Sequence, residues 1–272
     1  MFSTDRGLYT PRQLYQLGGT PDVTCDLIPP AVDLAASAYY HWVLDVDADS
    51  VVLPVIPDGA LDLVLCPTLE DFAALYHPVD RAFALTLEGP IRYVGTCLRL
   101  ERFGALFARE PEALRALAPG AETVDVLALE PLIERLGESA DVGQIGLAFD
   151  EFLRARVRYG ARNTAARTDA TLSLFERFLD AIEPEHVADI ARSVGISERQ
   201  LRRETHRLFG LAPKKIQRIV RSQRAIGELV GDAPSGIDYH DDSHRIRELR
   251  ALTGCTPGEI RRLAGKYNTR RR

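Results

Sequence analysis

The segment from Val187 to Arg203 constrains the fold of this chain more than any other. Its whole residue pattern fits two short helices joined by a tight turn. Gly195 follows a helical apolar stripe and can adopt the positive φ that a residue just past a helix end often needs. Ser197 can then cap the next helix through its hydroxyl. The sequence therefore predicts a helix-turn-helix over about 185–209. The stripe on the first helix consists of Val187, Ile190, Ala191 and Val194.

The second helix of this unit is strongly basic. Between positions 199 and 224 the chain has nine basic residues and a single acidic one, Glu204. A capped, basic second helix behind a tight turn is the geometry that enters a DNA major groove. Clustered positive charge also neutralises phosphates. The pattern therefore indicates double-stranded DNA as a partner.

Charge divides the chain into two parts. Residues 1–162 hold 13 basic and 24 acidic residues, whereas residues 163–272 hold 21 basic and 15 acidic ones. This asymmetry predicts an acidic sensing or assembly domain over 1–162, followed by a helical, nucleic-acid-facing domain over 163–272. Residues 160–164 are expected to link the two domains.

Several functional classes are disfavoured by composition. No apolar run approaches the roughly 20 residues of a membrane span, and the first ten residues lack the apolar core of a signal sequence. The four cysteines lie far apart without CxxC spacing, which favours reduced thiols. We therefore expect a cytoplasmic protein with no membrane partner.

The first domain is predicted to be β-rich with helices after the strands. Strands are expected at 39–44, at 50–56 with a break at Pro54, and at 61–66, the last pairing with its predecessor across the turn at 57–59. Two further strands, 82–87 and 91–100, complete a small, mostly antiparallel sheet or barrel. Helices are then expected at 102–108, 111–117, 126–136 and around 145–156, ending near 160.

The second domain is predicted to be all-α, which makes the whole chain an α+β protein. A helix with an apolar stripe (Leu172, Phe175, Leu179 and Ile182) ends at Pro184. Gly210 closes the second helix of the helix-turn-helix, and Pro213 suits the first position of a linker helix to about 230. The spacing of Arg247, Gly254 and Pro257 repeats that of Arg203, Gly210 and Pro213. It predicts a second unit over about 237–264.

These residues carry a resemblance. The segment 187–216, with Ser197, Leu201 and Pro213, and the segment 241–257 resemble the DNA-binding domain of the arabinose-regulator (AraC/XylS) family. The first half is similar to a sensor-type domain, on the basis of 57–59, 61–64 and 94–100. The resemblance implies a bacterial transcription factor, a homodimer, a small-molecule effector in the first domain and RNA polymerase as a further partner. It implies no cofactor.

The resemblance also assigns site residues. The base-reading positions are Arg199, Arg202 and Arg203, because arginine can bridge the O6 and N7 atoms of guanine. Phosphate contacts, which fix the register of a protein on DNA, fall to a second set: Ser197, Gln200, Arg207, Lys214 and Lys215. In the second unit the corresponding residues are Ser243, His244 and Arg247.

The second unit departs from the family pattern. Only residues 231–237 stand where a full scaffold helix is usual, and three acidic residues near them should repel phosphates (Asp238, Asp241 and Asp242). Arg245 also occupies a position that is usually apolar, and Thr205 one that is usually phenylalanine. We therefore predict one intact and one truncated unit, with the first doing most of the DNA reading. The alternative is a degenerate family member that acts as a protein-interaction module without specific DNA binding.

The sequence gives weaker signals for metal binding, for catalysis and for a ligand pocket. His240 and His244 are four residues apart, but no third metal ligand is evident, so no metal site is predicted. No convergent nucleophile, base and acid set or phosphate loop is visible, so no catalytic residue is predicted and the chain is not expected to be an enzyme. Residues 40–42 could line an effector pocket, although packing into the core is favoured. Asp58 is expected to belong to a turn.

Overall fold

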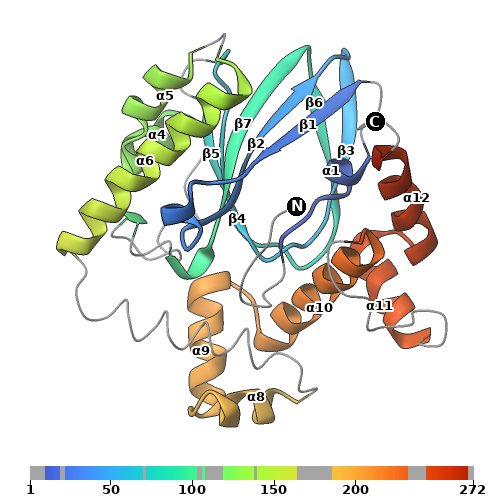
Figure 1. Cartoon of the computed structure of the whole chain (residues 1–272). Helices are drawn as coiled ribbons and strands as arrows, with labels where there is room; N and C mark the ends of the chain where they lie inside the picture. Colours follow the sequence, from blue (N-terminus) through green and yellow to red (C-terminus); the bar gives the residue numbers. More distant parts are fainter. Residues whose placement is uncertain are drawn as a thin grey trace.

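The computed structural model describes residues 10–18, 22–69, 72–102, 106–107, 119–137, 140–163, 186–231 and 243–268. Figure 1 shows a β-structure flanked on one side by the helices that follow it and contacted on another side by the C-terminal helices. No helix in these ranges is long and apolar enough to cross a membrane.

Two antiparallel sheets form the first half of the chain. The larger sheet has the strand order β1-β2-β7-β4-β5, and the smaller one pairs β3 with β6. The larger sheet is built from Val23–Ile28 (β1), Ala38–Val46 (β2), Ile91–Leu98 (β7), Leu61–Leu65 (β4) and Ala73–Tyr76 (β5). The smaller one is built from Ser50–Val55 (β3) and Phe83–Glu88 (β6). The predicted small antiparallel β-domain is therefore confirmed.

Both faces of the larger sheet are covered, and because side chains alternate along each strand, neighbouring residues pack in different clusters. One face (Val43, Leu63, Val94 and Leu98) shares a cluster with the helices that follow the sheet. The opposite face carries Trp42, Leu44 and Val64, which share a second cluster with Leu53 of β3 and Leu87 of β6. The second cluster therefore lies between the two sheets.

The strand positions were predicted better than their pairing. The expected hairpin between 50–56 and 61–66 is wrong, because β3 pairs with β6 while β4 pairs with β5 and β7. The turn at 57–59 instead carries the chain from one sheet to the other. Pro54 does not break β3, since a two-stranded sheet offers the edge position where a missing N–H is tolerated. Strands β1 and β5 were not predicted.

Three helices cover one face of the larger sheet: Ala121–Leu127 (α4), Glu130–Leu136 (α5) and Val142–Asn163 (α6). The single helix expected over 126–136 is interrupted at Ala128, whose φ is 49°, and α5 has Pro131 in its first turn. Helix α6 continues through 163, so the linker expected at 160–164 is helical up to that residue. The predicted helices at 111–117 and around 172–182 lie outside the described residues.

The C-terminal part is helical, as predicted. Its helices are Val187–Ser193 (α8), Glu198–Phe209 (α9), Pro213–Leu229 (α10), Ser243–Thr253 (α11) and Pro257–Asn268 (α12). Gly210 and Gly254 have positive φ angles of 71° and 75°, and each is followed three residues later by a proline that begins the next helix. The repeated glycine-to-proline spacing is thus a repeated turn. The segment predicted to lack a scaffold helix, after Gly231, lies outside the described residues.

A short N-terminal segment joins the two parts. Helix α1 (Leu14–Leu17) places Leu14 and Leu17 in a cluster with Ile226 of α10, Leu249 of α11 and Ile260 of α12. Between Leu98 and the helices on the sheet, a short 3-10 helix (η2, Leu100–Arg102) also contacts α9. Another 3-10 helix (η1, Val32–Leu34) contacts α6.

Candidate DNA-binding helix and internal cavity

Helix α9 is held in place at both ends. The Gln200 backbone N–H donates to Ser197 Oγ at 3.2 Å, which confirms the predicted cap. Gly195 adopts φ 76° in the turn before it, and Gly210 ends the helix in the left-handed region. Three apolar side chains fix its buried face: Leu201, Leu208 and Phe209. Thr205, at the position where the family has phenylalanine, is also buried and donates to the Arg202 carbonyl.

The predicted base-reading residues share the exposed face of α9. At 100° per residue, Arg199, Arg202 and Arg203 point away from buried Leu201 and Leu208, and all three are exposed. His206 lies on the same face and is exposed. It was not among the predicted DNA contacts, although its spacing from Arg199 and Arg202 places it on this face.

Two of these arginines form ion pairs at the surface. Arg202 Nη2 lies 3.3 Å from Glu198 Oε2, and Arg203 Nη2 lies 3.1 Å from Glu204 Oε1. Glu204 also accepts from Arg207 Nε at 3.0 Å. Although burial alone would raise it, the pKa of Glu204 is held below its ordinary value by the hydrogen bonds from Arg207 and Arg203. Glu204 therefore orders the side chains of two predicted DNA contacts.

The two predicted lysine contacts differ in their surroundings. Lys214 and Lys215 are both exposed in the first turn of α10. Lys215 Nζ forms an ion pair with Asp80, which lies between β5 and β6. The hydrogen bond from Lys215 holds the pKa of Asp80 below its ordinary value. This ion pair joins the predicted DNA-facing side of the helical part to the β-domain.

The second unit is attached to the linker helix. Arg218 Nε of α10 donates to Glu248 Oε1 of α11 at 2.7 Å, and Arg221 lies 4.0 Å from the other oxygen of Glu248. Ser243 and Arg247 of α11 are exposed, and Arg247 Nε donates to the Ser243 carbonyl. The side chains of His244 and Arg245, like residues 238–242, lie outside the described residues.

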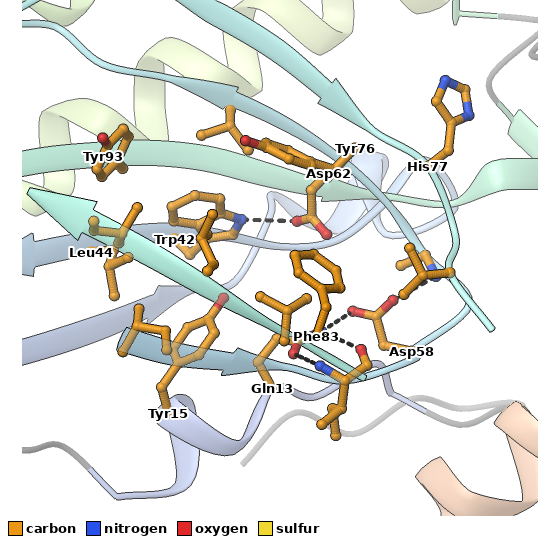
Figure 2. A pocket seen from close by; sticks show the side chains of 18 of the residues that line it. Gln13, Tyr15, Trp42, Leu44, Asp58, Asp62, Tyr76, His77, Phe83 and Tyr93 are labelled. Atoms are coloured by element: carbon orange, nitrogen blue, oxygen red, sulfur yellow. Dashed lines mark hydrogen bonds between the residues drawn. The ribbon is translucent and has the colours of Figure 1, made fainter. Parts of the chain in front are cut away.

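A cavity of about 300 Å³ lies between the two sheets. Figure 2 shows side chains from both sheets and from α1 around it. Trp42 of β2 lies over Gly95 of β7, where an added Cβ would come within 2.3 Å of the indole ring. Large apolar side chains form most of the wall, among them Tyr15, Trp42, Leu53, Phe72, Phe83, Leu85 and Tyr93.

The cavity also contains two carboxyl groups. Trp42 Nε1 donates to Asp62 Oδ1 at 3.0 Å. Asp58 accepts from the Ala60 N–H at 3.1 Å and from Gln13 Nε2 at 2.8 Å, so it stabilises the turn, as predicted, but faces the cavity as well. Burial raises the pKa of both groups, and the nearby charge of Asp58 helps to raise that of Asp62 to about 8.

The three residues proposed for either a pocket or the core are divided between these roles. Trp42 lines the cavity, whereas Tyr40 is buried and donates to the Pro11 carbonyl. His41 faces the other side of the sheet, where its ring nitrogens lie 2.9 Å from Thr96 Oγ1 and 3.2 Å from Asp150 Oδ1. His41 and Thr96 are both fully buried. This hydroxyl, imidazole and carboxylate set therefore holds α6 against the sheet.

Two protein-family models match the chain. One, described as a helix-turn-helix domain, covers residues 190–263, and the other, a domain of unknown function (DUF6597), covers residues 26–117. Among solved structures the chain is similar to apo ToxT from Vibrio cholerae, with a TM-score of 0.41 and 8% identity, over 91% of this chain and 99% of that one. No curated protein matches. The chain therefore combines a C-terminal helix-turn-helix domain of the AraC type with an N-terminal DUF6597 domain.

Proposed function

We propose that this protein is a sequence-specific transcription regulator that reads DNA mainly through α9. The observation that carries this proposal is the shared exposed face of Arg199, Arg202 and Arg203 on a capped helix inside the matched helix-turn-helix domain. Inserted in a major groove, these side chains can donate paired hydrogen bonds to guanine edges. His206 on the same face extends this surface by one helical turn.

The ion pairs of the α9 arginines are compatible with this role. The side chains of Arg202 and Arg203 are more than half exposed. Ion pairs between exposed side chains contribute about 0–1 kcal/mol to stability. Exchanging Glu198 for a base edge therefore costs little.

Phosphate contacts are proposed for the residues that flank this face. Ser197 and Gln200 lie at the amino end of α9, where backbone N–H groups favour an anion. Lys214 and Arg207 lie on either side of the turn at Gly210. Helix α11, fixed to α10 through Glu248, is proposed as the weaker second contact, with Ser243, His244 and Arg247 as its DNA-facing residues.

The first domain, proposed to span about 1–162, would supply the signal. Its cavity supports a small-molecule effector, since a mostly apolar space with a few polar groups is the usual form of such a site. We also propose a homodimer, because two half-sites specify more base pairs than a single small unit can.

A selection of genomic DNA fragments by the full-length protein tests this function. The native protein should recover a defined motif, and an Arg202→Ala/Arg203→Ala variant should lose it, with affinity reduced at least about 100-fold. Arg247→Ala should reduce affinity much less. Arg158→Ala on α6, which also removes one exposed arginine, serves as the matched control and should leave the motif unchanged.

A salt series separates specific from general binding. Loss of phosphate contacts reduces the slope of log affinity against log salt, whereas loss of a base contact reduces specificity. If the native protein recovers no motif and has the same salt slope as the double variant, α9 does not read DNA. The chain would then be a protein-interaction module of the same family.

A further inference from the structure

The mouth of the cavity between the two sheets is aromatic. Tyr76 at the end of β5 and Phe83 at the start of β6 are 41% and 38% exposed, although both line the cavity. Behind them lie Phe72, Tyr93 and Trp42, and Phe72 and Tyr93 meet edge to face at 6.0 Å between ring centres. A ligand that enters past Tyr76 and Phe83 would therefore meet less exposed rings further in, of which Trp42 is buried.

The cavity contains two acidic side chains, and its lining also includes Gln13, His77 and Thr86. Asp58 and Asp62 line it, and no arginine or lysine does so among the described residues. Asp62 Oδ1 accepts from Trp42, and no described residue donates to Oδ2. Figure 2 shows Asp62 next to the Trp42 indole, and Asp58 and Phe83 line the same cavity. The interior thus presents aromatic surfaces and one carboxyl oxygen that accepts no hydrogen bond from any residue that the structure describes.

We propose that this cavity binds a small organic cation with an apolar body, such as an alkyl- or arylammonium ion, with Asp62 as its counter-ion. The proposal rests on the proposed function in one respect, that the cavity is the effector site of a regulator. Aromatic faces attract cations, most strongly when water is excluded, and a carboxylate in the same cavity adds direct charge attraction. An anionic ligand would meet two acidic groups and, among the described residues that line the cavity, no arginine or lysine.

Binding should be linked to loss of a proton. Burial and the charge of Asp58 raise the pKa of Asp62 to about 8, so near neutral pH much of Asp62 is protonated. A permanently charged cation favours the carboxylate form, and its affinity should therefore rise with pH until Asp62 is fully ionised.

The other titratable groups around Asp62 support this assignment. Burial raises the pKa of the neighbouring phenols and thiols, so they stay neutral through this range: Tyr15 of α1, Cys25 of β1, Tyr40 of β2, Tyr76 of β5 and Cys97 of β7. Asp58 is held by hydrogen bonds from Ala60 and Gln13. His77 also lines the cavity, and Figure 2 shows its ring turned away from Asp62.

Trp42 gives a direct readout, because it is the only tryptophan in the chain and lines the cavity. Its fluorescence in the full-length protein would be titrated with benzyltrimethylammonium and, separately, with the uncharged molecule of the same shape, neopentylbenzene. We expect saturable binding of the cation at least about tenfold tighter than that of the neutral probe. Equal binding of the two, tighter binding of phenylpropanoate as an anionic probe, or no response to the cation would overturn the proposal.

Variants test whether Asp62 supplies the charge that binds the cation. Asp62→Asn keeps the size of the side chain and an acceptor for Trp42, and it should weaken cation binding at least about tenfold and abolish its pH dependence. Asp49→Asn, which removes an exposed carboxyl group from the turn between β2 and β3, should change neither. Persistent pH dependence in Asp62→Asn contradicts the assignment even if affinity falls. The ligand series on the native protein decides the case without any variant.

The same samples separate this inference from the proposed function. Fragment selection is carried out with and without benzyltrimethylammonium. Recovery of a motif without cation binding refutes the ligand class alone. Cation binding without a motif supports the cavity assignment and refutes the regulator.

Discussion

Gln223 of α10 connects the two parts of the chain through a single buried side chain. Its amide donates to the carbonyls of Pro57 and Arg12 at 2.9 and 3.1 Å, and its Oε1 accepts from the Arg12 N–H at 2.9 Å. Pro57 directly precedes the cavity residue Asp58, and Arg12 directly precedes Gln13. Gln223 therefore links α10 to the two segments that carry these cavity residues.

Replacing Gln223 by leucine should destabilise the protein. The side chain is fully buried, so three backbone groups would lose their partner where water cannot substitute, at a cost of about 2–4 kcal/mol. Urea unfolding measures the loss. Gln144→Leu on α6 is the control, because its hydrogen bonds with Asp141 are exposed and should contribute less than about 1 kcal/mol. Equal losses in the two variants would refute the importance of the buried contact.

The residues that the sequence predicted correctly act on near neighbours. Gly195, Ser197 and Gly210 form turns and caps with residues a few positions away, so their types and spacing were sufficient to predict these features. Asp62 and Gln13 were not predicted as cavity residues, because their partners are distant in sequence. Trp42 was placed on the correct strand, but alternation alone did not show which sheet face encloses the cavity.

At the level of elements, the cap of α9 decides how firmly the proposed DNA-reading helix is formed. Removing the hydroxyl in Ser197→Ala leaves the Gln200 N–H without its acceptor and should reduce the free energy of unfolding by about 1 kcal/mol. Thermal unfolding measures this change. Ser197→Asn keeps a capping oxygen and should recover most of the stability. Failure of asparagine to do so would show that Ser197 acts in another way.

Helices were more predictable than strand partners. The apolar stripes of α8 and α10 are visible in the sequence, since each buries one face against neighbours fixed by the turn residues. The pairing of β3 with β6 depends on the chain crossing between sheets at 57–59, and a turn signal does not specify this. The break between α4 and α5 was not predicted, because the apolar helical pattern runs across Ala128, which takes a positive φ although it is not a glycine.

For the molecule as a whole, the ion pair between Lys215 and Asp80 holds a proposed phosphate contact against the β-domain. Asp80→Asn should release Lys215 and strengthen DNA binding a few-fold at low salt, with a salt slope steeper by up to about one. Fluorescence anisotropy with the selected motif measures both quantities. Asp33→Asn, which removes the carboxylate paired with Arg154 on the far side of the first domain, is the control. An unchanged slope in Asp80→Asn would show that Lys215 does not reach phosphate.

The packing of α1 against α10, α11 and α12 has a practical consequence for anyone who expresses the parts separately. A fragment that begins after α6 would leave Ile226, Leu249 and Ile260 without Leu14 and Leu17, and it would expose an apolar surface that promotes aggregation. Residues 10–17 would have to be supplied to such a fragment, covalently or as a peptide, for it to stay monodisperse. A boundary drawn from family matches alone would omit them.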